Sequence, residues 1–316
     1  MGRAGLSAPP SVITANFLRG MEEIIKKVII PIAGLGTRFL PLSTVVPKEL
    51  WPLVDKPMVQ YAVEEAKASG ASRVIFVAKP GKKEVINYFR AYSAAEKALR
   101  VRKRDHLVAD LHIIRELCAS LSFSLASQEK PLGDGHAILQ AKRLVRGEPC
   151  GVLFCDDIVV SKTPCLAQLA RTYRTCEKPI VALKRVSYDK IKQYGCVQVE
   201  RIANRLYKIK KIIEKPDPAA APSDLVIVGK YILTPEVFDY LQKAKPTERH
   251  REIILAVVLN EMIQDGKIIY GYEFEGEWLE CATKMDWMKS NMYLGLHHLQ
   301  WGRELKEHIK GYSNRG

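Results

Sequence analysis

A short glycine-rich segment followed by two basic residues is the part of this sequence best suited to chemistry. Gly34 and Gly36 follow a run of apolar residues, and Arg38 and Lys48 come shortly after them. Glycines allow backbone amides to approach an anion closely, arginine presents a planar fork of donors, and lysine adds a point charge. These residue types in this order predict a site for the phosphates of a nucleotide.

Two common phosphate-binding fingerprints do not fit this segment. Phe39 stands where the dinucleotide fingerprint G-x-G-x-x-G requires its third glycine. No strand-like run is followed by G-x-x-x-x-G-K-[ST] either. For the loop taken alone, a tight strand-to-loop turn with an incidental arginine remains the alternative, because short glycine motifs are weak evidence.

An aspartate at the end of another apolar run is the candidate metal ligand. Asp156 follows residues 151–155, which read as a buried strand, and a sheet meets its ligand cleft at such strand ends. Its carboxylate suits a divalent cation held beside phosphates, although an aspartate there is often only a turn former. The adjacent Asp157 would point to the opposite face, so we interpret it as structural.

The elements that must position these residues alternate between strand and helix through the first two-thirds of the chain. Apolar runs predict strands at 26–33, 73–78, 121–128 and 151–155, and amphipathic spacing predicts helices at 56–69, 82–99 and 135–145. This order predicts an α/β fold. We expect a Rossmann-like three-layer sandwich with a mostly parallel central sheet and with ligands at the carboxyl ends of its strands.

The remainder of the chain is richer in strands. Strand patterns at 180–186, 196–200, 206–214 and 226–231 predict a smaller β-rich insertion. Helices are expected at 235–243 and 251–265, a strand at 268–274, and one long C-terminal helix at 285–308. Residues 1–23 lack periodicity and read as a disordered or vector-derived leader. We therefore divide the chain into this leader, a catalytic domain at 24–295, and a C-terminal helix and tail at 296–316.

Composition limits the classes of partner. The formal net charge of +14 would suit nucleic acid, but the basic stretches carry no recognised nucleic-acid motif, so no such partner is expected. No apolar run approaches the ~18 residues that a membrane span needs. Seven cysteines without a C-x-x-C pair predict free thiols in a reducing, cytoplasmic setting.

Several motifs, taken together in their order, resemble one enzyme family. The chain is similar to the bacterial-type UTP–glucose-1-phosphate uridylyltransferases, or UDP-glucose pyrophosphorylases, of the sugar nucleotidyltransferase superfamily. The resemblance covers about residues 24–295. It rests on residues 33–38, 47–49, 52–61, 128, 133–137, 154–158, 194–195, 214–216 and 228–231.

The resemblance implies a Mg²⁺-assisted transfer of a uridylyl group from UTP to glucose 1-phosphate, by in-line attack on the α-phosphorus. It implies catalytic roles for Arg38, Lys48, Asp156 and Lys215. It implies nucleotide binding by Ala33, Gly34, Gly36, Thr37, Glu49, Gln128 and Gly133. It implies sugar-phosphate binding in the β-rich insertion by Gly195, Glu214, Lys215 and Lys230, and metal binding by Asp156 and Glu280. Relatives commonly form dimers or tetramers, so a homo-oligomer is expected.

The sequence departs from the family pattern near the expected metal. Glu280 and Ala282 stand where the family usually has aspartate and glycine, and Asp134 sits among the glycines expected near the base. A glucose-1-phosphate thymidylyltransferase is one alternative. A weakly catalytic homologue that binds sugar nucleotides is the other, and the changes at 280 and 282 motivate it.

Overall fold

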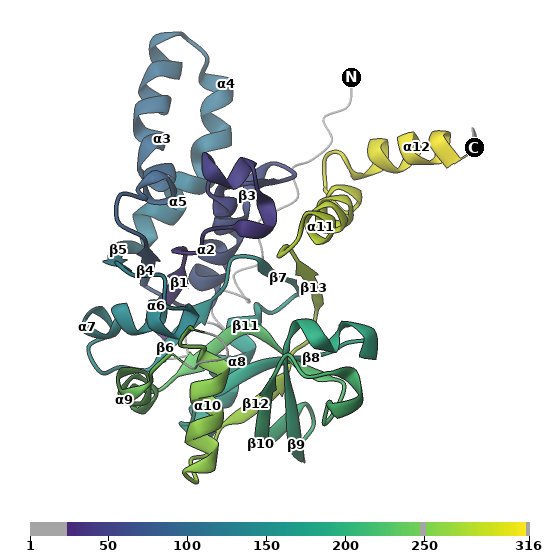
Figure 1. Ribbon diagram of the computed structural model, residues 1–316. Helices are drawn as coiled ribbons and strands as arrows, with labels where there is room; N and C mark the ends of the chain where they lie inside the picture. Colours follow the sequence, from purple (N-terminus) through teal and green to yellow (C-terminus); the bar gives the residue numbers. More distant parts are fainter. Residues whose placement is uncertain (1–23, 247–250, 314–316) are drawn as a thin grey trace.

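A nine-stranded mixed sheet forms the centre of the molecule (Figure 1). The computed structural model describes residues 24–246 and 251–313. The strands lie in the order β5-β4-β1-β6-β11-β8-β12-β10-β9. Their bounds are β1 Lys27–Pro31, β4 Arg73–Ala78, β5 Ser122–Ser127, β6 Cys150–Leu153, β8 Ile180–Arg185, β9 Gly195–Ala203, β10 Leu206–Glu214, β11 Leu225–Leu233 and β12 Tyr270–Glu273.

Helices cover both faces of this sheet. Side chains alternate along β1, so Val28 and Ile30 enter one apolar core while Ile29 enters another on the opposite face. The first core includes side chains of α2 Met58–Ala68, α3 Glu84–Val101, α5 His112–Ser120 and α8 Cys165–Cys176. The second includes those of α6 Asp134–Gln140, α7 Lys142–Val145, α9 Pro235–Lys243 and α10 Leu255–Gln264. The predicted three layers are present.

The two ends of the sheet differ in strand direction. β5, β4, β1 and β6 are parallel, as the sequence predicted. Beyond them β11 is antiparallel to β6 and β8, and β10 is antiparallel to β12 and β9. β9 also pairs back with β11 at Cys196 and Val226, so this end curls into a barrel-like form.

The prediction of a mostly parallel sheet with a separate β-rich insertion was therefore wrong in part. The strand-rich segment continues the central sheet and makes it mixed. Alternation along a strand predicts that the strand exists, but it does not identify the neighbour with which the strand pairs.

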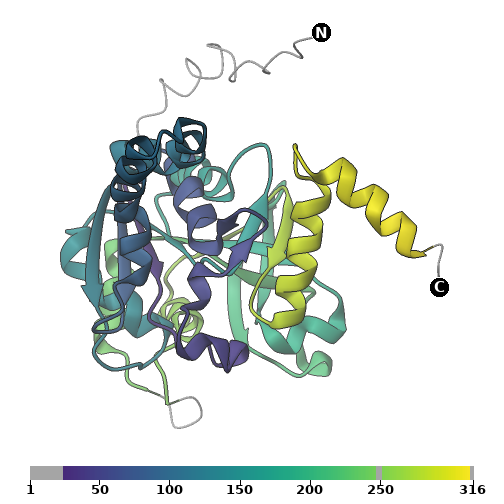
Figure 2. The ribbon, with the colours of Figure 1, turned by 90° about the horizontal axis from the view of Figure 1, so that it is seen from above.

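The predicted long C-terminal helix is also wrong, because the structure has two helices there. α11 spans Lys284–Leu296 and α12 spans Gly302–Ser313. A Cβ atom at Gly302 would lie 2.7 Å from the Leu296 carbonyl oxygen, so the turn between the helices needs a glycine. Figure 2 shows α12 directed away from the rest of the described molecule. A further short helix, α4, spans Asp105–Val108.

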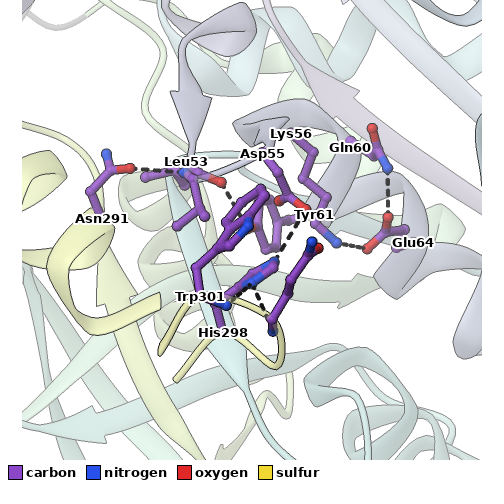
Figure 3. Close-up of polar contacts among 11 residues, drawn as sticks. Leu53, Asp55, Lys56, Gln60, Tyr61, Glu64, Asn291, His298 and Trp301 are labelled. Carbon is purple, nitrogen blue, oxygen red and sulfur yellow. Dashed lines mark hydrogen bonds and ion pairs between the residues drawn. The ribbon is translucent and has the colours of Figure 1, made fainter. Parts of the chain in front are cut away.

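The C-terminal segment is attached to the hairpin that follows the glycine loop (Figure 3). This hairpin consists of β2 Pro52–Leu53 and β3 Lys56–Pro57. Asn291 accepts a hydrogen bond from the Val54 amide at 2.9 Å, and the His298 ring lies 3.4 Å from the Asp55 carboxylate. Trp301 stacks on His298 with ring centroids 4.3 Å apart. These contacts brace the hairpin from outside the sheet.

Other predictions are tested only in part. All seven cysteines are unpaired in the structure. Among the helices of residues 24–246 and 251–313, none is long and apolar enough to cross a membrane. The predicted leader, residues 1–23, lies outside the described residues, and the domain division at 295 stays a prediction.

Candidate active site

A cleft of about 530 Å³ lies beyond the carboxyl ends of β1, β5 and β6, and we call it the glycine-loop cleft. The loops that follow these three strands form its wall, as expected for a parallel arrangement. The structure thus brings together residues that are far apart in the sequence, although their roles stay predictions. The predicted residues that line the cleft are Ala33, Gly34, Gly36, Thr37, Arg38, Lys48, Glu49, Gln128, Gly133 and Asp156.

The glycine loop turns sharply at Gly36. Its φ of +64° is left-handed, and an added Cβ would lie 3.1 Å from the Ser43 Cβ. Phe39 is buried and packs edge-on against Trp51, with ring centroids 4.5 Å apart. This anchor leaves the adjacent Arg38 exposed at the cleft.

Lys48 and Asp156 form an ion pair in the wall of the cleft. The Lys48 Nζ lies 2.5 Å from the Asp156 Oδ2. Burial disfavours both charges, but their mutual attraction outweighs it, so the pKa of Lys48 is raised and that of Asp156 is lowered. The pair is therefore charged at neutral pH, with a cation and an anion both at the cleft.

Glu49 lines the same cleft, but its carboxylate is already engaged. Its Oε2 lies 2.8 Å from the Lys82 Nζ, and the two side chains are 1% and 5% exposed. Lys82 also donates to the Ile32 carbonyl at 2.5 Å. Through Lys82 the Glu49 carboxylate fixes the strand-to-loop junction, and nucleotide binding by Glu49 stays a prediction. Lys82 begins a helix predicted at 82–99, and no local pattern indicates its pairing with Glu49.

Gln128 and Gly133 are hydrogen-bonded neighbours in the lining of the glycine-loop cleft. The Gln128 Nε2 donates to the Gly133 carbonyl at 3.0 Å and lies 3.0 Å from the His136 Nδ1. Gly133 has a φ of +98°, and an added Cβ would lie 2.6 Å from the Ile253 carbonyl oxygen. Only glycine fits this position, which holds the loop tightly against the segment before α10.

A second cavity of about 190 Å³ adjoins the cleft, and we call it the Glu214 pocket. It is lined by the predicted residues Gly195, Glu214 and Lys215. The Lys215 Nζ lies 3.4 Å from the Glu214 Oε1. A Cβ at Gly195 would lie 3.2 Å from the Glu214 Oε2, so glycine leaves room for this carboxylate. Arg38, Asp134 and Phe154 line both cavities.

Lys230 does not line the Glu214 pocket, and its predicted contact with the sugar phosphate stays a prediction. Its neighbours Gly229 and Tyr231 line that pocket, and side chains alternate along β11. Lys230 therefore faces the other side of the sheet, where its Nζ lies 2.6 Å from the Glu65 Oε2. The Lys230 and Glu65 side chains are 1% and 10% exposed, so this is a buried structural pair.

Glu280 lies on the strand next to Asp157 but faces a different cavity from Asp156. β13 Glu277–Glu280 pairs with β7 Asp157–Val160, with Glu280 opposite Asp157. The Glu280 Oε2 accepts a hydrogen bond from the Tyr194 hydroxyl at 2.5 Å, and its carboxylate lines a cavity of about 430 Å³ beside α11. Burial raises the pKa of Glu280. Glu280 lies near the cleft, but its carboxylate is engaged by Tyr194.

Both carboxylate oxygens of Asp157 accept hydrogen bonds from the protein. Its Oδ2 accepts from the Gly229 amide at 3.1 Å and its Oδ1 from the Trp278 indole at 2.9 Å. Burial and the neighbouring Asp156 raise the pKa of Asp157 to about 7. These contacts join β7, β11 and β13, and Asp157 also lines the Glu214 pocket.

Carboxylate and phosphate oxygens are the ligands that Mg²⁺ prefers, and one or two carboxylates commonly suffice. Asp156 at the cleft fits this donor chemistry, with Glu280 on an adjoining strand. Within the described parts of the chain, no group of three or more His, Cys, Asp or Glu side chains could hold a metal ion. A cation here would therefore depend on phosphates for most of its ligands.

Known proteins match most of the chain. Residues 27–295 match the family described as Nucleotidyl transferase. UTP–glucose-1-phosphate uridylyltransferase 1 of Staphylococcus saprophyticus is 36% identical over 286 residues, which are 90% of this chain and 98% of that protein. A structure of UDP-glucose pyrophosphorylase complexed with UDP-glucose is 34% identical, with a TM-score of 0.76 over 84% of this chain and 97% of the other. The UTP-bound UGPase from Acinetobacter baumannii is 32% identical, with a TM-score of 0.81 over 90% and 98%.

Proposed function

The chain belongs to the nucleotidyl transferase family, among the UTP–glucose-1-phosphate uridylyltransferases, and we propose that it makes UDP-glucose from UTP and glucose 1-phosphate. The observation that carries this proposal is the pair of adjoining cavities with Arg38 at their boundary. UTP occupies the glycine-loop cleft and glucose 1-phosphate occupies the Glu214 pocket. Arg38 then lies where the two phosphate groups must meet.

The reaction joins two anions. An oxygen of glucose 1-phosphate attacks the α-phosphorus of UTP, the bond from that phosphorus to the β-phosphate oxygen breaks, and pyrophosphate leaves. No protein nucleophile is needed, so alignment and positive charge supply the rate enhancement. Arg38 and Lys48 stabilise the charge on the phosphates of UTP, while Lys215 holds the phosphate of the acceptor.

Mg²⁺ fits the donor set at the cleft, and Asp156 would hold it, with Glu280 as the second carboxylate. The ion supplies charge neutralisation and alignment of the phosphates when bound. Lys48 orients the Asp156 carboxylate through their ion pair. Glu280 would contribute its carboxylate from the end of β13, where its Oε2 accepts a hydrogen bond from Tyr194.

The two substrates contact different kinds of protein group. The base of UTP lies against Gln128 and the close-packed loop at Gly133, where an amide can pair with the uracil edge. Ala33, Gly34, Gly36 and Thr37 hold the triphosphate through their backbone. On the acceptor side Glu214 accepts sugar hydroxyls beside Gly195. The expected setting is the cytoplasm, and the expected assembly is a dimer or tetramer, which light scattering would measure.

A product assay tests the proposal. The purified protein is incubated with glucose 1-phosphate and Mg²⁺, with either UTP or dTTP, and the products are identified by chromatography and mass spectrometry. We expect UDP-glucose and pyrophosphate in equal amounts, with dTTP a poorer substrate. Preferential formation of dTDP-glucose would identify a thymidylyltransferase. Binding of UDP-glucose without turnover would identify a sugar-nucleotide-binding homologue, and either result would overturn the proposal.

A further inference from the structure

Asp134 stands at the boundary of the two cavities and has no role in the reaction as proposed so far. It lines both the glycine-loop cleft and the Glu214 pocket. Two other residues do the same: Arg38, which faces the phosphates, and Phe154, which is apolar. Asp134 is thus a carboxylate that lines both of the proposed substrate sites.

The Asp134 side chain is held in one orientation by two backbone amides. Its Oδ1 accepts from the Gly135 amide at 2.7 Å and from the Leu255 amide at 3.0 Å. The second bond caps the first turn of α10 from a loop far away in the sequence. Among residues 24–246 and 251–313, the hydrogen bonds of this carboxylate use Oδ1, so Oδ2 keeps its capacity to accept from a ligand.

The chemistry of the Glu214 pocket suits a hexose ring. Phe154 and Tyr231, with ring centroids 6.2 Å apart, give the pocket an apolar surface. Glu214, Asp134 and Asp157 place carboxylates in its lining, and both oxygens of Asp157 already accept hydrogen bonds from the protein. A hexose combines an apolar face of C–H groups with a rim of hydroxyl donors, and an ionised carboxylate only accepts hydrogen bonds. Apolar lining with a few placed polar groups is typical of a pocket that selects its ligand.

We propose that Asp134 accepts a hydrogen bond from one hydroxyl group of the acceptor hexose and so determines which sugar phosphates are used. The assignment rests on the proposed uridylyl transfer. Asp134 is suited to a neutral hydroxyl because its negative charge would repel the phosphates of either substrate. A fixed carboxylate also recognises a hydroxyl at little entropic cost, since its own orientation is already set.

The variant Asp134→Asn isolates this contact. Asparagine keeps one oxygen for the two backbone amides, so α10 stays capped, but its other atom becomes a donor. The measurement is kcat/KM for glucose 1-phosphate and for its 2-, 3-, 4- and 6-deoxy analogues. The wild type is expected to disfavour the analogue that lacks the hydroxyl bound by Asp134 by about 10- to 100-fold, the value of a hydrogen bond to a charged group. In the variant, that discrimination falls to about threefold or less, with the KM for UTP unchanged within the same factor.

Glu252→Gln is the matched control, because Glu252 lines the glycine-loop cleft and not the Glu214 pocket. It should discriminate among the analogues as the wild type does, and thermal unfolding confirms that both variants are folded. If Asp134→Asn keeps the full discrimination, Asp134 only caps α10 and the proposal is wrong. If the KM for UTP rises instead, the hydroxyl belongs to the ribose, which also overturns it. A wild type that makes no UDP-glucose would overturn the proposed function itself.

Discussion

The glycine-loop cleft and the Glu214 pocket adjoin but are built in different ways. The cleft lies beyond parallel strands, and loop residues form its wall, with a consecutive run from Ala33 to Phe39 in the glycine loop. The pocket is lined by side chains from β9, β10 and β11, which pair antiparallel in the mixed part of the sheet. In a loop, neighbouring residues can face one ligand together. In a strand, every second side chain faces away.

The charged groups of the two cavities also differ in how firmly they are held. At the cleft, Lys48 is paired with Asp156, and Glu49 is paired with Lys82 behind the wall. At the pocket, Lys215 keeps about half of its side chain exposed, at 48%, beside Glu214. The cleft is therefore fixed by pairs before UTP binds, while Lys215 retains freedom to follow the acceptor phosphate.

The largest expected effect comes from Asp156→Asn at the cleft. Loss of this carboxylate removes the partner of Lys48 and the candidate metal ligand, so turnover should fall by about 100- to 1,000-fold. Steady-state rates with saturating UTP, glucose 1-phosphate and Mg²⁺ measure the loss. Asp157→Asn is the matched neighbour: its contacts join strands, so it should lower the free energy of unfolding by about 1–3 kcal/mol and keep most turnover. Near-normal turnover of Asp156→Asn would contradict the assignment.

A large effect on stability is expected at Lys230. Lys230→Met leaves the Glu65 carboxylate buried without its partner, which should reduce the free energy of unfolding by about 3–5 kcal/mol. Urea denaturation measures the loss, and Lys230→Arg, which keeps the charge, should retain most of the stability. The KM of the folded variant for glucose 1-phosphate should be unchanged. A stable Lys230→Met protein with a strongly raised KM would instead place Lys230 at the acceptor.

The parts of the structure that could be predicted from the sequence are those set by local patterns. The parallel strands and the glycine loop follow from local patterns. An apolar run that ends in glycines and cations marks both the strand and the point at which its loop begins. The buried pair of Lys230 with Glu65 could not be predicted, because a lysine in a strand can face either side of the sheet until the strand's partners are known. Asp134 and Lys82 acquire their importance from contacts with Leu255 and Glu49, and no local pattern indicates such distant partners.

Four helices were missed or merged for a related reason. The chain between 285 and 308 has helical composition throughout, so nothing local separates α11 from α12 except Gly302 and its close contact. The helices α5 and α8 were not predicted, although Leu117 and Leu169 enter the same core as β1. Short amphipathic helices of this kind are stabilised by the sheet they cover more than by their own sequence.

A smaller effect is expected for Glu280, whose carboxylate accepts a hydrogen bond from Tyr194 in the lining of the Glu214 pocket. Glu280→Gln removes the second carboxylate proposed for the ion, so the Mg²⁺ concentration at half-maximal rate should rise by about 3- to 10-fold. Glu280→Asp should stay close to the wild type. Glu277→Gln, on the exposed side of the same strand, is the control. Equal Mg²⁺ midpoints in all of these proteins would exclude Glu280 as a ligand.

The smallest expected effect is a dependence on pH at Asp134. Burial raises the pKa of Asp134 to about 6, with the carboxylates of Glu214 and Glu252 adding to the shift. As pH falls from 7 to 5.5, Asp134 takes up a proton and loses accepting capacity, so the KM for glucose 1-phosphate should rise by about two- to fourfold. The charged or titratable groups around it are Arg38, Asp157, Tyr194, Glu214, Lys215, Tyr231 and Glu252, and Asp157 is unchanged in the Asp134→Asn variant.

The substrate phosphate also titrates in this range, and Asp134→Asn separates the two effects. The variant shares the contribution of the substrate but lacks that of the carboxylate. Its KM should therefore rise less steeply than that of the wild type as pH falls. Identical profiles for the two proteins would show that Asp134 does not titrate against the acceptor.

The division of the site into two substrate halves is the central claim, and a paired measurement of KM tests it most directly. Gln128 lines only the glycine-loop cleft and Lys215 only the Glu214 pocket. Gln128→Ala should raise the KM for UTP by about 10-fold and leave that for glucose 1-phosphate unchanged, and Lys215→Ala should do the reverse. If both variants raised the KM for the same substrate, the two cavities would not be separate substrate sites and the account would be contradicted.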